Sequence, residues 1–401
     1  MRIVNIGTDR LPVPPKFGGA YETYIYGVSK TLVRMGHEAH IISFDYCERE
    51  YEKDGIIYHT FSLNSPISKV LSKFLGLIDE PNKNVPYVNV KILKILETIN
   101  MKYGFIDVIH AHLLATCLAP IIFRRIYSNK TKLVLHWHNE PTPRKMKKWI
   151  NRWIAQEYDI HCTVSNYTRN KLINYLNINP AKVEVIYNAV DDEIFRFNIG
   201  SRKEMRHKLG LHDEYIVLYV GRIIPEKGLH HLILALPYVI KHLQKVKLII
   251  VGPKGHYEKE ERDYYSYIDE LIKRLCLQNF IIYLGSLQRE DLPKIYSASD
   301  VVVVPSLFQD SCPTVILEAM ACGRLVIAYN TGGIPEIIEK GITGYLVEKG
   351  DIEMLQKALV ACFNQNNHEN IALNSRMRIN KYFTFSAICE KLIRLYQRQV
   401  K

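Results

Sequence analysis

Short apolar runs alternate along this chain with longer stretches in which apolar residues recur every three or four positions. The runs are RIVNIG at 2–7, FIDVIHAH at 105–112, KLVLHWHN at 132–139, YIVLYVG at 215–221, KLIIVG at 247–252, FIIYLG at 280–285, VVVV at 301–304 and RLVIAY at 324–329. Runs of this length suit strands buried on both faces of a parallel sheet, and the stretches between them suit helices. Because strand and helix alternate in both halves of the chain, the pattern predicts a doubly wound α/β fold.

The stretch 301–338 shows this alternation most fully. After the valine run comes a loop, and the chain is expected to turn helical at Pro313, with Ser311 or Cys312 as the cap. Gly323 stands where such a helix commonly ends, before the next predicted strand. A helix that follows a buried parallel strand begins at the carboxyl edge of the sheet, where open α/β sheets bind ligands.

Two carboxylates lie on this predicted helix and on the loop that precedes it. Glu318 is set within VILEAMA, inside the predicted helix, and Asp310 lies on the loop before it. A buried carboxylate without a partner is costly, so a site that keeps one usually has a use for it. The alternative is that Glu318 lies on the one wet face of the helix. We expect both carboxylates at a ligand site, where the helix N-terminus also favours an anion.

Two glycine-bearing loops are candidates for phosphate binding. Gly18 and Gly19 stand at the predicted start of an amphipathic helix, where backbone amides can approach a phosphate, although simple loop geometry explains a glycine pair equally well. Arg222 and Lys227 flank the loop GRIIPEKG at 221–228, at the end of a predicted strand. Two cations there suit a diphosphate, and the alternative is a solvated loop with ordinary charges.

Four histidines stand at the ends of two predicted strands. They are His110 and His112 in the first strand and His136 and His138 in the second. Alternate positions point to the same face of a strand, so each pair is expected on one side of the sheet at the ligand edge. These histidines could be zinc ligands. However, no further Cys or carboxylate follows at metal spacing, and a lone pair of histidines is more often a hydrogen-bonded core feature.

Two further segments have basic, amphipathic patterns. Residues 65–101 contain an apolar helical stripe with lysines beside it; the default is a helix packed on the core, and membrane or acceptor contact is the alternative. Residues 143–154, PRKMKKWINRWI, are basic and carry Trp149 and Trp153 at helical spacing. The default there is a solvated helix with two packed tryptophans. The alternative is an interfacial patch for anionic lipid or a polyanionic acceptor.

Composition narrows the class of protein. The 401 residues suit two domains, and 47% hydrophobic with 23% charged residues is typical of a globular chain. The formal net charge of +12 favours acidic partners, yet no nucleic-acid motif accompanies it, so no specific nucleic-acid binding is expected. Eight cysteines without C-x-x-C pairs indicate free thiols in a reducing compartment. With neither a membrane span nor a signal peptide expected, the sequence predicts a cytoplasmic protein.

Several of these motifs together resemble the retaining glycosyltransferases of family four. The loop G-R-x-x-x-E-K-G is intact at 221–228, Asp310 and Glu318 have the spacing of the family's paired glutamates, and Asn188 to Asp191 match its N-G-V-D stretch with one change. The resemblance implies a GT-B fold, in which two Rossmann-like doubly wound parallel-sheet domains face a central cleft. It implies an N-terminal acceptor-side domain at 1–198, a nucleotide-sugar-binding domain at 199–383, and a last helix at about 384–401 that crosses back onto the first domain.

The resemblance also implies roles for individual residues. A phosphate clamp is expected from Arg222 and Lys227, a donor-sugar contact from Asp310, and a ribose contact from Glu318. Amides for the donor phosphates are expected from Gly18, Gly19, Thr314 and Val315, and His112 matches the family's active-site histidine, with His110 the second choice. The residues expected to take part in catalysis are His112, Arg222, Lys227 and Asp310. No metal ligand and no further cofactor is expected, because the two cations supply the countercharge.

Two departures from the family pattern bear on activity. The first glutamate is replaced by Asp310, and the usual Phe-Gly that follows is replaced by Cys312 and Pro313. Since proline has no amide hydrogen, one phosphate contact is lost or passes to Thr314 and Val315. A catalytically silent coat or scaffold protein and a sugar-nucleotide epimerase therefore stay open beside the transferase.

The expected activity is a metal-independent hexosyl transfer with retention, from a nucleotide-diphosphate sugar of the UDP type to a glycan, lipid or cell-surface acceptor. The front of the chain, with L-P-V-P-P at 11–15 and H-N-E-P at 138–141, resembles the spore-coat-associated subset of the family. That subset implies a role in a spore coat or cell-envelope polysaccharide. The alternative to a purely cytoplasmic location is a peripheral one at the inner membrane face, with the basic segment 143–154 in contact with the membrane.

Overall fold

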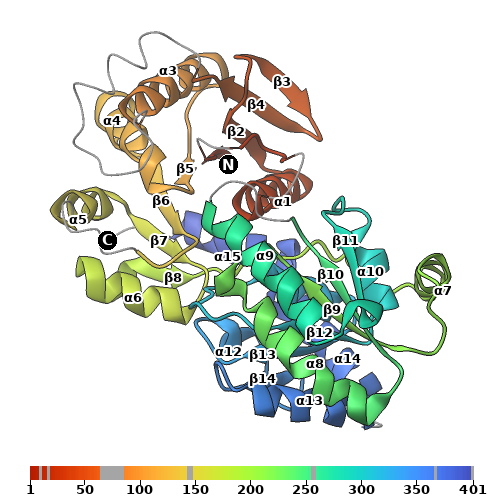
Figure 1. The fold of residues 1–401 in the computed structure, drawn as a ribbon. Coiled ribbons are helices and arrows are strands. Elements are labelled where there is room, and N and C mark those ends of the chain that lie inside the picture. The colour runs from red at the N-terminus through yellow and green to blue at the C-terminus, as the bar shows by residue number, and fades with distance from the viewer. Residues whose placement is uncertain are drawn as a thin grey trace. The chain divides into compact units, whose positions relative to one another are not determined.

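The computed structural model describes residues 1–8, 11–15, 19–63, 85–141, 148–253, 259–364 and 368–398. These residues divide into two compact units, the first at 1–187 with 385–401 and the second at 188–384 (Figure 1). The division falls after Tyr187, so residues 188–198, expected from the sequence in the first domain, belong to the second unit. The last helix belongs to the first unit, as expected.

The first unit is built on an eight-stranded sheet in the order β3-β4-β2-β1-β5-β6-β7-β8. All neighbours are parallel except β3 and β4, which pair antiparallel as a hairpin. Its elements are β1 (Arg2–Ile6), α1 (Ala20–Arg34), β2 (Glu38–Phe44), β3 (Glu50–Lys53), β4 (Ile56–Phe61), α3 (Val85–Tyr103), β5 (Val108–Ala111), α4 (Leu118–Tyr127), β6 (Lys132–Trp137), α5 (Lys148–Glu157), β7 (Ile160–Thr163), α6 (Asn166–Leu176), β8 (Val183–Val185) and α15 (Phe385–Gln397).

Helices cover both faces of this sheet. On one face, alternate strand residues such as Ile109, Leu133 and Leu135 join the apolar core formed with α3, α4 and α6. On the other face α1 packs beside α15 (Figure 1). Close packing there leaves no room at Gly27 of α1, where an added Cβ would lie 2.2 Å from the Phe385 ring. The histidines of β5 and β6 point to this second face, because they alternate with the core residues.

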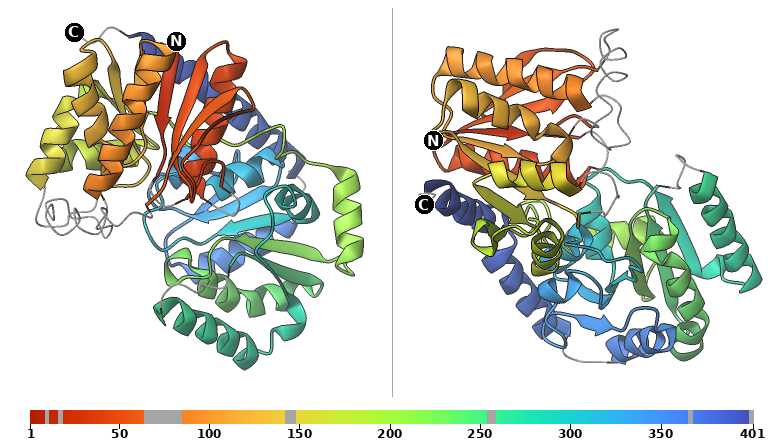
Figure 2. Two further views of the ribbon diagram at one scale, coloured as in Figure 1. Left: turned by 90° about the horizontal axis from the view of Figure 1, so that it is seen from above. Right: turned by 90° about the vertical axis from the view of Figure 1, so that its left-hand side faces the viewer.

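The second unit is built on a six-stranded parallel sheet in the order β11-β10-β9-β12-β13-β14. Helices lie on both faces of the sheet (Figure 2). Its elements are α7 (Ile199–Lys208), β9 (Tyr215–Val220), α8 (Leu229–Leu243), β10 (Val246–Val251), α9 (Lys259–Arg274), β11 (Ile281–Gly285), α10 (Leu292–Ala298), β12 (Val301–Val304), α11 (Thr314–Ala321), β13 (Leu325–Tyr329), α12 (Ile334–Ile337), β14 (Tyr345–Val347), α13 (Ile352–Asn364) and α14 (His368–Tyr382).

The valine run behaves as its composition predicts. All four residues of β12 are buried, and Val301 and Val303 join the core that packs against α8 and α13. A strand that is buried on both faces needs neighbours on both edges, which β9 and β13 supply. The prediction of two doubly wound parallel-sheet α/β units is confirmed. Within the described residues, no helix has the length and apolar character that crossing a membrane requires.

Candidate functional site

Two loops of the second unit meet at the carboxyl edge of its sheet. The loop after β9 contains Glu226, whose carbonyl accepts a hydrogen bond from the Leu307 amide at 2.8 Å on the loop after β12. Gly228 has φ 68°, and a Cβ there would lie 2.0 Å from the Pro305 carbonyl oxygen. The closing glycine of G-R-x-x-x-E-K-G is therefore needed both for its backbone conformation and for this close approach. The contact brings the two predicted motifs together.

Lys227 and Asp310 form the charged centre of this edge. The Nζ atom of Lys227 lies 2.7 Å from Oδ2 of Asp310 and 4.6 Å from the centre of the Phe308 ring. Asp310 is only 8% exposed, so the pair is screened less than a surface pair would be. The sequence predicts both residues in the site, but their spacing does not show that they neutralise each other. A diphosphate that binds Lys227 has to compete with this carboxylate.

The loop that carries Asp310 is held by backbone contacts from the loop after β13. The Gly333 amide donates to the Asp310 carbonyl at 2.8 Å, and the Gly332 amide donates to the Gln309 side chain at 2.6 Å. Gly332 has φ 55°, and a Cβ there would lie 2.2 Å from the same Asp310 oxygen. From the other side, the Asn188 side-chain amide donates to the Cys312 carbonyl at 2.7 Å. Sequence reasoning missed these supports, because they join residues far apart in the chain.

Helix α11 begins one residue later than predicted. Pro313 is its N-cap, no side chain caps it, and the helix runs from Thr314, so the expected cap by Ser311 or Cys312 is wrong. The first amides of an α-helix have no partner within the helix. Those of Thr314 and Val315, both half-buried, are therefore available in principle for an anion at this end.

Glu318 lies inside the protein. It is 7% exposed, and the Tyr296 hydroxyl of α10 donates to its Oε2 at 2.8 Å. Burial raises the pKa of this carboxyl above its ordinary value of 4.5, while the nearby Arg289 and the Tyr296 hydrogen bond act in the opposite direction. The interpretation that Glu318 lies on a wet face is wrong. Nothing in the spacing pointed to Tyr296, which lies on a different helix.

Arg222 lies two residues past the end of β9, and its side chain is exposed. Its carbonyl accepts a hydrogen bond from the Tyr219 hydroxyl at 2.9 Å, which ties the loop to the strand below it. The structure therefore places this guanidinium at the carboxyl edge of β9, on the same loop as Lys227. At that position the guanidinium is accessible to a ligand that binds from solution.

The predicted glycine turn of the first unit is only partly described. Gly18 lies outside the described residues, whereas Gly19 has φ 90° and is the N-cap of α1. The first turn of α1 already contains a carboxylate, because Glu22 is 4% exposed and hydrogen-bonds Thr8. A Cβ at Gly19 would lie 2.7 Å from Glu22 Oε2. A phosphate at this helix end would meet the Glu22 carboxylate.

The four histidines form a row of stacked rings on the α1 and α15 face of the first sheet. Neighbouring ring centres lie 4.3 Å apart within each pair, His110 with His112 and His136 with His138. His112 donates or accepts on both nitrogens, at 3.1 Å to His138 Nε2 and at 3.3 Å to Asn5 Oδ1. Burial and the neighbouring imidazoles lower the pKa of His112 well below 6.5, so its ring is neutral.

The second basic segment differs from its default interpretation. Residues 142–147 lie outside the described residues, and α5 starts at Lys148. Trp149 is 69% exposed and Trp153 is 41% exposed, so the expectation that both tryptophans are packed is wrong. The Arg125 guanidinium of α4 lies 5.8 Å from the Trp153 ring centre. Trp149 and Trp153 thus place large apolar surface in solvent beside basic side chains.

The other amphipathic segment, residues 65–101, is described only from residue 85 onward. Residues 64–84, which hold most of the predicted stripe, are outside the described residues. Over the described part, α3 buries Val88, Ile92, Leu96 and Ile99 in the core of the first unit. Helix α3 is therefore packed on the core, whereas the choice between core packing and membrane contact for the stripe itself falls on residues outside the described ranges.

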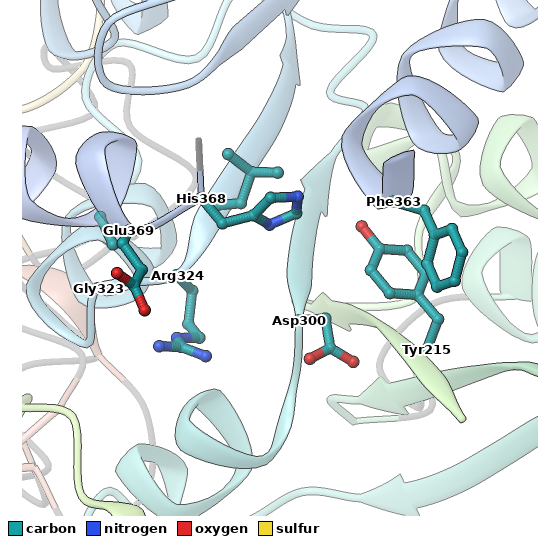
Figure 3. Close-up of a pocket in the computed structure, with 9 residues that line it drawn as sticks. Tyr215, Asp300, Gly323, Arg324, Phe363, His368 and Glu369 are labelled. Carbon is teal, nitrogen blue, oxygen red and sulfur yellow. The ribbon is translucent and has the colours of Figure 1, made fainter. Parts of the chain in front are cut away.

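A cavity of about 340 Å³ lies at the opposite edge of the second sheet, where the strands begin (Figure 3). Asp300 on its wall is paired with Arg202 at 2.6 Å and with Arg206 at 2.7 Å. Arg324, also on the wall, donates to the Ser299 carbonyl at 3.1 Å. Since these charges satisfy one another at the amino ends of the strands, the cavity does not belong to the candidate site.

Comparison with known proteins agrees with both units. The family model described as Glycosyltransferase Family 4 matches residues 17–194, and the model described as Glycosyl transferases group 1 matches residues 201–382. Spore coat protein SA of Bacillus subtilis is 26% identical over 99% of this chain and 100% of its own length. The lipopolysaccharide 1,2-N-acetylglucosaminetransferase of Salmonella typhimurium is 25% identical over 95% and 99%. The crystal structure of Anabaena HepE in complex with UDP matches with a TM-score of 0.75 at 22% identity, over 98% of each chain.

Proposed function

This chain belongs to the glycosyltransferases of family four with the GT-B fold, and from that premise we propose that it transfers a hexose from a nucleotide-diphosphate sugar, with retention and without a metal ion at the donor site. The ion pair of Lys227 with Asp310 is the observation that supports this proposal most directly. It joins the two motifs from which the family resemblance was drawn, at the edge of the sheet where ligands bind. The retaining stereochemistry rests on the resemblance alone.

The chemistry requires that negative charge on a departing diphosphate be stabilised. In our proposal Lys227 turns from Asp310 to the diphosphate, and Arg222 adds a second cation from the same loop. The amides of Thr314 and Val315 complete the anion site. Asp310, released from Lys227, accepts hydrogen bonds from the hydroxyls of the donor sugar.

Glu318 and His112 have the remaining proposed roles. In our proposal Glu318 accepts hydrogen bonds from the ribose hydroxyls of the nucleotide, and its acceptor capacity beyond the single phenolic donor supports this role. His112 is held neutral by burial, and a neutral imidazole can position a sugar hydroxyl through either nitrogen. The network with Asn5 and His138 fixes its ring orientation.

The donor and the acceptor are proposed by class. Anabaena HepE, which shares the fold, was solved with UDP, and this favours a UDP-sugar as donor. The Salmonella relative is an N-acetylglucosaminetransferase of lipopolysaccharide, and the Bacillus relative is a spore coat protein. We therefore propose a glycan or lipid-linked acceptor of the cell envelope or spore coat, met by a cytoplasmic enzyme.

A nucleoside diphosphate is expected to stabilise the protein without added divalent metal, because Lys227 and Arg222 supply the countercharge. At 100 times its dissociation constant, a ligand that binds only the folded state adds about 2.7 kcal/mol. The measurement is thermal unfolding with UDP, GDP and ADP at millimolar concentration, in the presence and absence of EDTA. The quantity compared is the shift between samples with and without nucleotide in the same buffer.

The matched variants for this experiment are Lys227→Met and Lys245→Met. Both lysines lie in the second unit and pair with an aspartate, but the side chains of Lys245 and its partner Asp213 are exposed, at 67% each. The nucleotide shift should fall strongly for Lys227→Met and stay unchanged for Lys245→Met. If wild-type protein shows no shift with any nucleotide, the transferase proposal fails. If the shift disappears only with EDTA, the metal-free donor site alone is wrong.

A second proposal concerns the acceptor side, where α5 carries the exposed Trp149 and Trp153 beside basic residues. We expect this surface to bind anionic membranes, since tryptophans enter the interface and lysines attract the headgroups. Replacing Lys145, Lys147 and Lys148 by glutamine should weaken sedimentation with anionic liposomes and leave the nucleotide shift unchanged.

The control removes the same charge from the second unit, by replacing Lys340, Lys349 and Lys381 with glutamine. It should sediment like wild type. Wild-type protein that stays in the supernatant with anionic vesicles would decide against membrane binding and leave α5 as an ordinary solvated helix.

A further inference from the structure

A cysteine, Cys162, lies beside the row of four histidines in the first unit. In the parallel register, His136 of β6 lies directly beside Cys162 of β7, and His110 of β5 stacks on His136 with ring centres 5.3 Å apart. One potential ligand atom from each of these three residues lies within 4.8 Å of the others, and all three residues are buried. A second triplet, His112 with His136 and His138, meets the same distance.

The two triplets differ in how many of their ligand atoms are already used. In the second triplet, His112 is hydrogen-bonded on both nitrogens and His138 Nε2 is one of its partners. In the first, His110 Nε2 and both nitrogens of His136 have no hydrogen-bond partner among the described residues. The Ile186 backbone lies near the His136 ring and acts on its pKa, but it is not a partner at hydrogen-bonding geometry. Since His136 belongs to both triplets, the first is distinguished by the unpartnered Nε2 of His110.

The outer contacts of His110 prepare it as a ligand. Its Nδ1 atom lies 2.7 Å from the hydroxyl oxygen of Tyr396 on α15. When Nδ1 carries the proton and donates to this oxygen, Nε2 keeps a bare lone pair. Histidines that bind metals commonly donate their second nitrogen in this way, which fixes the tautomer and the orientation of the ring.

Leaving these nitrogens empty is expensive. A buried polar group without a hydrogen bond destabilises the folded state, and three such nitrogen atoms lie in one place. Neutral imidazoles and a cysteine are also the ligands that zinc prefers. A buried water is the simpler occupant, and it would satisfy the nitrogens without using the sulfur.

We propose that His110, His136 and Cys162 bind a zinc ion in the interior of the first unit. The two imidazoles give lone pairs, and the Cys162 thiol loses its proton to solvent as the sulfur–zinc bond forms. Three protein ligands leave the fourth tetrahedral position for a water molecule. Through Tyr396 the site holds α15 to the sheet, so its role is structural. It lies in a different unit from Lys227 and Asp310, whereas the ring of His112, which has its own role in the proposed transfer, stacks on His110 with ring centres 4.3 Å apart.

The test uses the full chain without a histidine tag, produced in minimal medium with either zinc or cobalt, because a buried ion enters during folding. Metal content is measured after dialysis, and the cobalt protein is examined by absorption spectroscopy. We expect about one equivalent of metal per chain, with a thiolate-to-cobalt charge-transfer band in the near ultraviolet. Cys162→Ser should lose that band and most of the metal.

The matched control is Cys117→Ser, another buried thiol of the first unit, whose partner is the Leu114 carbonyl. It should retain both metal and band. Metal that binds without the charge-transfer band would place the ion among the histidines alone and overturn the assignment of Cys162. Folded wild-type protein that contains neither zinc nor cobalt would show that the cluster holds only water.

A milder variant, Tyr396→Phe, keeps the size of the side chain and removes the oxygen that accepts from His110 Nδ1. Loss of such an outer partner typically weakens metal binding by about 10- to 100-fold. A competition assay with a chelator measures this ratio. An unchanged ratio for Tyr396→Phe would contradict the ligand role of His110, even if metal were present.

Discussion

Asp310→Asn is expected to lower sugar transfer by roughly 5- to 150-fold while nucleoside diphosphate binding stays equal or tightens. The loss corresponds to about 1–3 kcal/mol for a charge-assisted hydrogen bond to the donor sugar. The gain has a separate origin, because Asp310 neutralises Lys227 at 2.7 Å in the free protein. Asparagine competes for that cation only weakly, because its amide oxygen carries no negative charge, so Lys227 is more available to the diphosphate.

Asp310→Glu tests the fit of the shorter carboxylate. Glutamate reaches about 1.5 Å further than aspartate, because it has one more methylene group. The loop cannot easily retreat, since the Gly333 amide, the Gly332 backbone and Asn188 all hold it. We therefore expect the longer side chain to overfill the site and lower turnover, although it restores the family's usual residue.

Transfer or donor hydrolysis is measured for wild type and both variants, and nucleotide affinity by calorimetry. The control is Asp213→Asn, which removes a carboxylate from the exposed Lys245 pair in the same unit and should change neither quantity. Equal rates for wild type and both Asp310 variants would show that this carboxylate does not contact the donor sugar. A wild type that binds nucleotide but transfers nothing would favour the silent scaffold.

Much of the fold could be predicted because its signals are local. Each buried parallel strand is a continuous apolar run, and VVVV at 301–304 needs no partner in the sequence to be recognised. The same is true of motifs within one loop. Arg222 and Lys227 are only five positions apart, so the sequence alone shows that both lie on the loop at the end of one strand. The family resemblance then joined this loop to Asp310, and the 2.7 Å pair shows the two together.

The rest depended on contacts that spacing does not encode. Tyr296 donates to Glu318 from another helix, and the Gly333 amide donates to the Asp310 carbonyl from the next loop. Exposure was equally hidden, because Trp149 and Trp153 have the helical spacing of a packed stripe yet lie in solvent. Periodicity tells which residues share a face, and only the neighbouring elements decide whether that face is covered.

Glu318→Gln is expected to stabilise the protein and weaken nucleotide binding together. Glutamine keeps the shape and can still accept from the Tyr296 hydroxyl, but it carries no charge to bury. The lost charge-assisted contact with the ribose should reduce nucleotide affinity by about tenfold. Opposite changes in stability and binding are typical of residues that serve a ligand at a cost to the fold.

The stability part has a defined pH dependence. Burial raises the pKa of Glu318 in the folded state above its ordinary 4.5, so between these two values the folded protein holds a proton that the unfolded chain has lost. The free energy of unfolding therefore falls as the pH rises through this window. Below the unfolded pKa the penalty is absent, and above the folded pKa it is complete. Glu318→Gln should match wild type in acid and exceed it at neutral pH.

Tyr296→Phe separates the effect of burial on the Glu318 pKa from that of the hydrogen bond. It removes the hydrogen bond, which lowers this pKa, and leaves the buried carboxylate in place. Its penalty at neutral pH should exceed that of wild type, since the folded-state pKa then rises further. Urea unfolding at several pH values gives the three curves, and calorimetry gives the nucleotide affinities. A Glu318→Gln protein with wild-type affinity for nucleotide would make the carboxylate a structural group, and the ribose contact would then have to come from another residue of the second unit.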